Sequence, residues 1–119
     1  MLEERTRPGQ GDQVEVSHAP LGSHVSTQGG VENVPVRAGE IGADAVQIFT
    51  SAPQRWSASR ISEASAAAFR DGVIESGIRT TVAHDSYLIN LATDRVDLLA
   101  RSISAFNSEL ERASLLGLD

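Results

Sequence analysis

Side chains that could carry chemistry gather just after three short apolar runs of this chain. His24 lies near the end of the run 19–25, and His84 directly follows the run 80–83. Imidazole is the commonest metal ligand in proteins and exchanges protons near neutral pH. The chain has no cysteine, which excludes thiolate ligands, a cysteine nucleophile and disulfides. A single histidine beside a strand is more often a packing or capping residue than a ligand, so the surrounding residues must decide.

Other polar and aromatic side chains follow the same runs. The loop after the run 45–49 contains Gln54, Arg55 and Trp56, and the loop after 80–83 contains Tyr87. Taken alone, Tyr87 is as readily a ring packed over the rim of the fold as a ring that contacts a ligand. We interpret Trp56 as a packing residue rather than a base-stacking one.

Three units, each a strand followed by a helix, must position these loops. The predicted strands are 19–25, 45–49 and 80–83. The first two predicted helices are Val31–Ile41, closed by Gly42, and 62–77, capped by the Ser62 hydroxyl. The third runs over 94–116 and ends at Gly117, with an apolar stripe expected to be its buried face: Val96, Leu99, Ile103, Phe106, Leu110 and Ala113.

This alternation predicts an α/β fold with a parallel sheet. Right-handed crossovers place all three helices on one side of strands laid down in order, which is the beginning of a TIM (β/α)8 barrel. A barrel of about 250 residues has eight units, so 119 residues would supply roughly the first three. A flavodoxin-like open sheet is the competing architecture, although it normally has five strands.

Composition limits the classes of protein to which the chain can belong. Of its 119 residues 40% are hydrophobic, enough for one modest core, and residues 1–17 are too polar to order, so we expect a disordered leader before one domain at 18–119. The net charge is −6, so no basic stripe is available to hold nucleic acid by charge alone. Neither a signal peptide nor a membrane span is visible, so we expect a cytoplasmic protein with no membrane partner.

Three segments, in order and spacing, resemble the endonuclease IV family of abasic-site DNA repair enzymes. GSHVSTQGG at 22–30 is similar to the family's G-x-H-V-S-x-x-G-G motif, and QIFTSAPQRW at 47–56 is similar to its second loop. AHDSYLINLA at 83–92 is similar to the family's P-H-D-S-Y-L-I-N-L. The resemblance extends from about Leu21 to Asp119.

The resemblance implies a TIM barrel whose mouth holds a trinuclear zinc (Zn2+) cluster and hydrolyses the phosphodiester 5′ to an abasic nucleotide in double-stranded DNA. It makes His84 a zinc ligand, Tyr87 a ring that enters the DNA, and His24 a residue behind the metal or facing the phosphate. The family commonly reads P-R-x-W in the second loop, where its arginine enters the base stack. This chain has Gln54 at that position and Arg55 beside it, and we assign both to DNA binding.

Only one of the zinc ligands that the resemblance implies is present, so we expect an N-terminal fragment that is inactive alone. Unpaired sheet edges and an uncovered apolar face also predict self-association. Two other readings stay open at this point: a fragment of a sugar isomerase-like barrel, and a non-catalytic module that pairs its sheet edge with another chain.

Several remaining residues have structural interpretations. Glu109, Glu111 and Arg112 are predicted to be solvated surface of the third helix. Asp85 and Ser86 are expected to orient His84 or to cap the next segment. Ser26 and the glycines 29–30 are consistent with a structural turn or with an anion site at a helix N-terminus.

Overall fold

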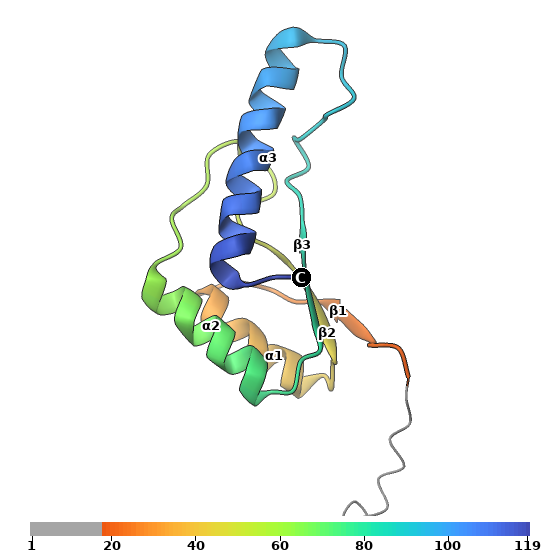
Figure 1. The fold of residues 1–119 in the computed structure, drawn as a ribbon, viewed down its shortest axis with the longest axis vertical. Coiled ribbons are helices and arrows are strands. Elements are labelled where there is room, and N and C mark those ends of the chain that lie inside the picture. The colour runs from red at the N-terminus through yellow and green to blue at the C-terminus, as the bar shows by residue number, and fades with distance from the viewer. Residues whose placement is uncertain (1–17) are drawn as a thin grey trace, which may run out of the picture.

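A three-stranded parallel sheet with helices on one side forms the fold (Figure 1). The computed structural model describes residues 18–119, so the predicted leader at 1–17 lies outside the described residues. The strands occur in the order β1, β2, β3 along the sheet. They are β1 (Gly22–His24), β2 (Ala45–Phe49) and β3 (Thr80–His84). The predicted α/β class and the parallel arrangement are confirmed.

The first strand is shorter than the predicted run 19–25. Pro20 has no N–H to donate to a neighbour, so regular pairing begins only at Gly22, opposite Ala45. This pair lies unusually close, because a Cβ added to Gly22 would sit 1.8 Å from the Ala45 carbonyl oxygen. Glycine is therefore needed where β1 meets β2.

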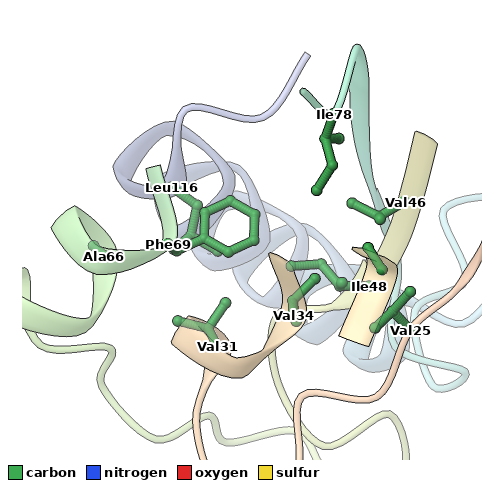
Figure 2. Packing of buried hydrophobic residues seen from close by; sticks show 10 residues of the cluster. Val25, Val31, Val34, Val46, Ile48, Ala66, Phe69, Ile78 and Leu116 are labelled. Carbon is green, nitrogen blue, oxygen red and sulfur yellow. The ribbon is translucent and has the colours of Figure 1, made fainter. Parts of the chain in front are cut away.

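The core lies between the sheet and the helices (Figure 2). Side chains alternate across a strand, so Val46 and Ile48 of β2 face the helices and are 2% and 0% exposed. Phe69 is the largest fully buried side chain. The other buried apolar residues of this cluster are Val25, Val31, Val34, Ala38, Ala66, Ile78 and Leu116.

The first predicted helix forms in two parts. A 3₁₀ turn, η1 (Val31–Asn33), leads into α1 (Val34–Glu40), with Pro35 in its first turn. Proline is tolerated there because its missing N–H would have no partner inside the helix. Gly42 follows the helix with φ of 69°, which confirms the predicted glycine stop.

The second helix, α2 (Glu63–Glu75), begins as predicted. The Ser62 hydroxyl oxygen accepts a hydrogen bond from the Ser65 backbone N–H at 3.1 Å. Gly77 follows the helix at φ 69°. Inside α2, Gly72 lets the helix approach α1 closely, because a Cβ built there would lie 2.7 Å from Pro35 Cγ.

Gly72→Ala is therefore expected to destabilise the chain even though alanine favours a helix. Overpacking against Pro35 costs about 1–3 kcal/mol, and the gain in helix propensity is about 1 kcal/mol. Gly39→Ala in α1 is the matched control, since nothing lies within 4 Å of its added Cβ, and it should be neutral or stabilising. Urea unfolding of the two variants measures the difference, and equal stabilisation by both would contradict the prediction.

The third helix, α3 (Val96–Leu116), has nearly the predicted bounds and ends at Gly117 with φ of 66°. Its buried face, however, was predicted wrongly. Of the expected stripe, Val96, Ile103 and Leu110 are 83%, 47% and 52% exposed. The residues that α3 buries are Ser102, Glu109 and Leu116.

The orientation of α3 has a physical cause. Ser102 and Glu109 bind polar groups of the loops after β3 and β2, and these bonds fix the rotation of the helix. Part of the apolar stripe, namely Phe106, Leu110 and Ala113, lines an open groove along β3. Within residues 18–119, no helix is both long and apolar enough to cross a membrane.

Candidate functional site

The carboxyl ends of the three strands meet at one edge of the sheet, and the predicted site residues lie there. His24 ends β1, Phe49 ends β2 and His84 ends β3. Val46 and Ile48 face the helices, so the alternate residues Gln47 and Phe49 lie on the opposite face, with His24 and His84 beside them. The Phe49 ring centroid is 4.6 Å from that of His24 and 5.0 Å from that of His84.

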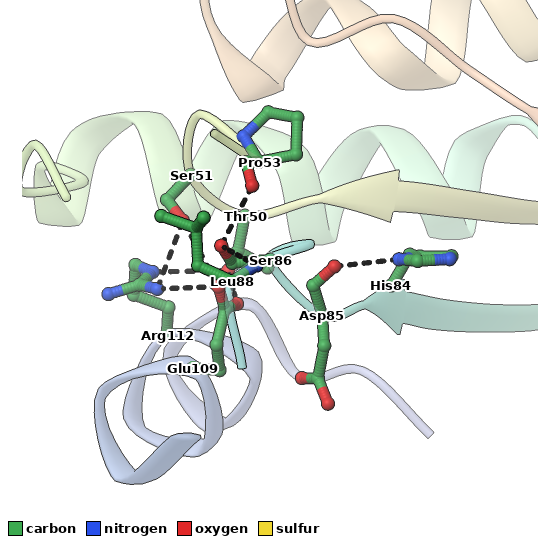
Figure 3. Close-up of polar contacts among 9 residues, drawn as sticks. All are labelled: Thr50, Ser51, Pro53, His84, Asp85, Ser86, Leu88, Glu109 and Arg112. Atoms are coloured by element: carbon green, nitrogen blue, oxygen red, sulfur yellow. Dashed lines mark hydrogen bonds and ion pairs between the residues drawn. The ribbon is translucent and has the colours of Figure 1, made fainter. Parts of the chain in front are cut away.

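His84 is exposed, and its second ring nitrogen has no hydrogen-bond partner among residues 18–119. Its Nδ1 lies 2.7 Å from the backbone carbonyl oxygen of Asp85 (Figure 3). A carbonyl only accepts, so Nδ1 donates, and the lone pair is on Nε2. A neutral imidazole held by its other nitrogen is the usual form of a zinc-binding histidine. His84 therefore fits a metal ligand.

His84 has no companion ligands nearby in the described chain. Residues 18–119 contain no group of three or more histidine, aspartate and glutamate side chains placed to hold a metal ion. A zinc site usually takes three or four protein ligands. A complete site built on His84 would need ligands from other residues.

Tyr87 stands beside His84 with most of its side chain in solvent. It is 62% exposed, and its ring centroid lies 5.9 Å from the His84 ring and 5.4 Å from the Phe49 ring, both edge-on. The backbone below the ring is fixed, because the Tyr87 N–H donates to the Pro53 carbonyl at 2.9 Å. The Tyr87 side chain can therefore contact a partner molecule while its backbone stays in place.

The second loop joins the third at this point. The Pro53 carbonyl also accepts from the Ser86 hydroxyl at 2.8 Å (Figure 3). Gln54 and Arg55 follow as exposed residues of the loop. Trp56 is half-buried, and the Arg101 guanidinium of α3 lies 4.5 Å from its ring centroid. This cation–π contact gives Trp56 a packing partner, in line with its predicted role.

Comparison with known proteins identifies the family. No protein-family model matches the chain. A probable endonuclease 4 of Campylobacter concisus is 44% identical over 100 residues, which cover 82% of this chain and 35% of that protein. A probable endonuclease 4 of Thermoplasma acidophilum is 42% identical over 97 residues, covering 82% and 34%. The crystal structure of endonuclease IV from Thermus thermophilus matches with a TM-score of 0.80 at 35% identity, covering 84% of this chain and 38% of that one.

The chain belongs to the endonuclease IV family. It spans about a third of the length of the relatives it matches. Its three parallel βα units correspond to part of the endonuclease IV barrel, which confirms the predicted fold class.

Within this family member, the residues next to His84 act through backbone atoms and hydroxyls. The Asp85 carbonyl orients the imidazole, and the Ser86 hydroxyl oxygen accepts from the Leu88 N–H at 3.3 Å.

Burial raises the pKa of the Asp85 carboxyl, the Glu109 charge raises it further, and the His84 charge lowers it. A raised carboxyl pKa makes the folded chain favour the protonated form. The contribution of Asp85 to stability therefore falls as pH rises through that pKa.

The prediction that Glu109 and Arg112 are solvated surface is wrong. Glu109 is 5% exposed, and its Oε1 lies 3.0 Å from Arg112 Nη2. The hydroxyls of Thr50 and Ser51, directly after β2, both donate to the Glu109 carboxylate (Figure 3). Arg112 donates in turn to the same two hydroxyl oxygens, at 3.1 and 3.3 Å. This network fastens the second loop to α3, while Glu111 is exposed as predicted.

The sequence holds one signal for this network. Thr50 and Ser51 are two adjacent hydroxyls directly after a buried strand, and such groups need partners when a helix covers them. Glu109 and Arg112 lie three residues apart on one helix face and can therefore act together. Only the observed rotation of α3 brings the two hydroxyls into contact with the Glu109 and Arg112 side chains.

The turn after β1 satisfies its own polar groups. The Ser26 hydroxyl oxygen accepts from the Gln28 N–H at 3.1 Å, and the Ser26 carbonyl accepts from Arg37 at 2.8 Å. The Gly30 N–H donates to the Thr27 carbonyl at 2.9 Å. These bonds favour the structural interpretation of the turn over an anion site.

Proposed function

We propose that this chain forms part of a zinc-dependent endonuclease that cuts double-stranded DNA 5′ to abasic sites during base excision repair. The observation that carries the proposal is the pairing of His84 and Tyr87 at the carboxyl edge of an endonuclease IV fold. One offers a free imidazole nitrogen, and the other an exposed ring whose centroid is 5.9 Å away. A ligand and a stacking ring side by side suit a reaction on a distorted nucleic acid.

The residues of this chain have separate tasks in the proposed reaction. His84 would hold zinc through Nε2, and when bound, zinc supplies hydroxide near neutral pH and neutralises the phosphate. Tyr87 would fill the gap left by the missing base, since stacking requires no particular sequence. Gln54 and Arg55 would contact the DNA from the same edge of the sheet, because the loop that carries them is hydrogen-bonded to the backbone of Tyr87.

The whole reaction is best tested in a chimaera. Residues 18–119 would replace the matching segment of the Thermus thermophilus endonuclease IV, with which they share 35% identity. We expect zinc-dependent nicking of a duplex with one abasic site and none of an intact duplex. The 119-residue chain alone, with His84 as its one predicted ligand, should bind zinc weakly and leave both duplexes uncut.

Two variants of the chimaera test the residue roles. His84→Gln should lower nicking by at least about 10–100-fold, the range seen even for residues that support a ligand. Tyr87→Ala should weaken binding to abasic DNA about tenfold or more, the value of one stacked base. Ile74→Ala, at an exposed site on α2, is the control. Unchanged activity of both test variants would refute the proposed function.

A further inference from the structure

The two histidines of the site are held by hydrogen bonds of opposite sense. His84 Nδ1 faces a carbonyl oxygen, as described above, so its proton is on Nδ1. His24 Nδ1 instead lies 3.1 Å from the side-chain nitrogen Nε2 of Gln47. An amide nitrogen only donates, so His24 Nδ1 accepts, and its proton must be on its own Nε2.

The fold makes this contact between His24 and Gln47 a consequence of register. The two residues are direct partners in the pairing of β1 with β2. Neighbouring strands are about 4.8 Å apart, which brings side chains on one face into hydrogen-bond reach. Gln47 is half-buried and lies below Phe49 on the same face, so its amide is held in the sheet rather than in a loop.

Phe49 keeps the two imidazoles apart. Its ring centroid is within 5.0 Å of both histidine rings, on the strand between theirs. Two strand spacings separate β1 from β3 by about 10 Å. Because His24 Nδ1 is engaged with Gln47 and its Nε2 carries the proton, His24 offers no lone pair to a zinc ion held by His84.

We propose that Gln47 is a positioning residue that fixes His24 as the Nε2–H tautomer. His24 is thereby an N–H donor to an anionic phosphate oxygen of the substrate and is not a zinc ligand. Because His24 is exposed at the carboxyl end of β1, its Nε2–H can donate to an anionic oxygen of a bound substrate. The role of His24 toward the phosphate rests on the proposed function, whereas its tautomer does not.

Nitrogen-15 NMR of the histidine-labelled 119-residue chain measures the tautomer directly. At about pH 9 imidazoles are neutral, and protonated and bare ring nitrogens have well-separated shifts. Signals are assigned with His18→Gln, His24→Gln and His84→Gln variants. We expect the proton on Nε2 in His24 and on Nδ1 in His84. A proton on Nδ1 of His24 would overturn the proposal.

Gln47→Glu tests whether Gln47 is the cause. A carboxylate only accepts, so His24 should move its proton to Nδ1 in this variant, while His84 keeps its tautomer. Gln47→Leu, which has neither donor nor acceptor, should give His24 a mixture of both forms. A His24 tautomer that is the same in all three chains would refute the positioning role of Gln47.

Adding zinc, and separately adding abasic DNA, distinguishes failure of this proposal from failure of the proposed function. Zinc should shift His84 Nε2 and leave His24 unchanged, and coordination by His24 would overturn the proposal. If neither histidine responds to zinc in the chimaera with the Thermus thermophilus segment replaced, the zinc part of the proposed function fails while the tautomer result stands. A duplex with a tetrahydrofuran abasic analogue, shown to be bound by anisotropy, should shift the His24 Nε2–H signal. Bound duplex without that shift would refute the donor role.

Discussion

Glu109→Leu is expected to lower the free energy of unfolding by about 3–5 kcal/mol, the usual cost of removing one partner from a buried ion pair. The Glu109 and Arg112 side chains are only 6% and 13% exposed, so the remaining guanidinium would stay buried without its counter-charge. Thr50 and Ser51 would lose their shared acceptor as well. Urea unfolding followed by circular dichroism measures the loss.

Two further variants show whether the cost comes from the unpaired charge. Glu111→Leu changes an exposed glutamate two residues along the same helix and should alter stability by about 0.5 kcal/mol or less. The double variant Glu109→Leu/Arg112→Met should recover much of the loss, because apolar residues of similar volume often replace a buried pair without penalty. A single Glu109→Leu variant as stable as the parent would refute the structural role of the network.

Phe69→Ala should destabilise the chain by about 3–5 kcal/mol, as truncation of a buried phenylalanine usually does. Phe69 is 1% exposed and lies where α2 meets the rest of the core (Figure 2). Its removal leaves a cavity in a core of ten buried apolar residues within 18–119, and so small a cluster has few side chains that could move in to fill it. Denaturant unfolding checks the value.

Ile74→Ala on the same helix is the control for Phe69→Ala. Ile74 is 78% exposed, so its truncation should cost about 0.5 kcal/mol or less. A Phe69→Ala variant that loses less than about 1 kcal/mol would show that the core is loosely packed. The self-association predicted from unpaired sheet edges can be followed on the same samples by sedimentation.

The elements of this fold were predictable because they depend on local patterns. β2 was predicted at 45–49 and forms there. Ser62 caps the start of α2, and Gly42 and Gly117 follow the ends of α1 and α3, as expected. Each of these signals acts within a few residues, through capping bonds, glycine conformations or strand alternation. The site was located for the same reason, since parallel strands bring their carboxyl ends to one edge.

The buried face of α3 and the Glu109 network could not be predicted in this way. The apolar stripe through Ile103 and Leu110 is the stronger pattern on the helix, yet the polar residues Ser102 and Glu109 are buried. Hydrophobic periodicity describes what a helix could bury, whereas the partners across the interface decide what it does bury. Glu109 binds Thr50 and Ser51, which lie 59 and 58 residues before it in the sequence.

The sequence by itself determined the strand–helix order, the loops that carry His84 and Tyr87, and the family, because these depend on neighbouring residues and on motifs. The tertiary structure alone decided the rotation of α3, the burial of Glu109 with Arg112, and the hydrogen bond between His24 and Gln47. Each of those depends on side chains or backbone atoms meeting at distances of about 3 Å, and only the packed fold sets such distances between separate elements.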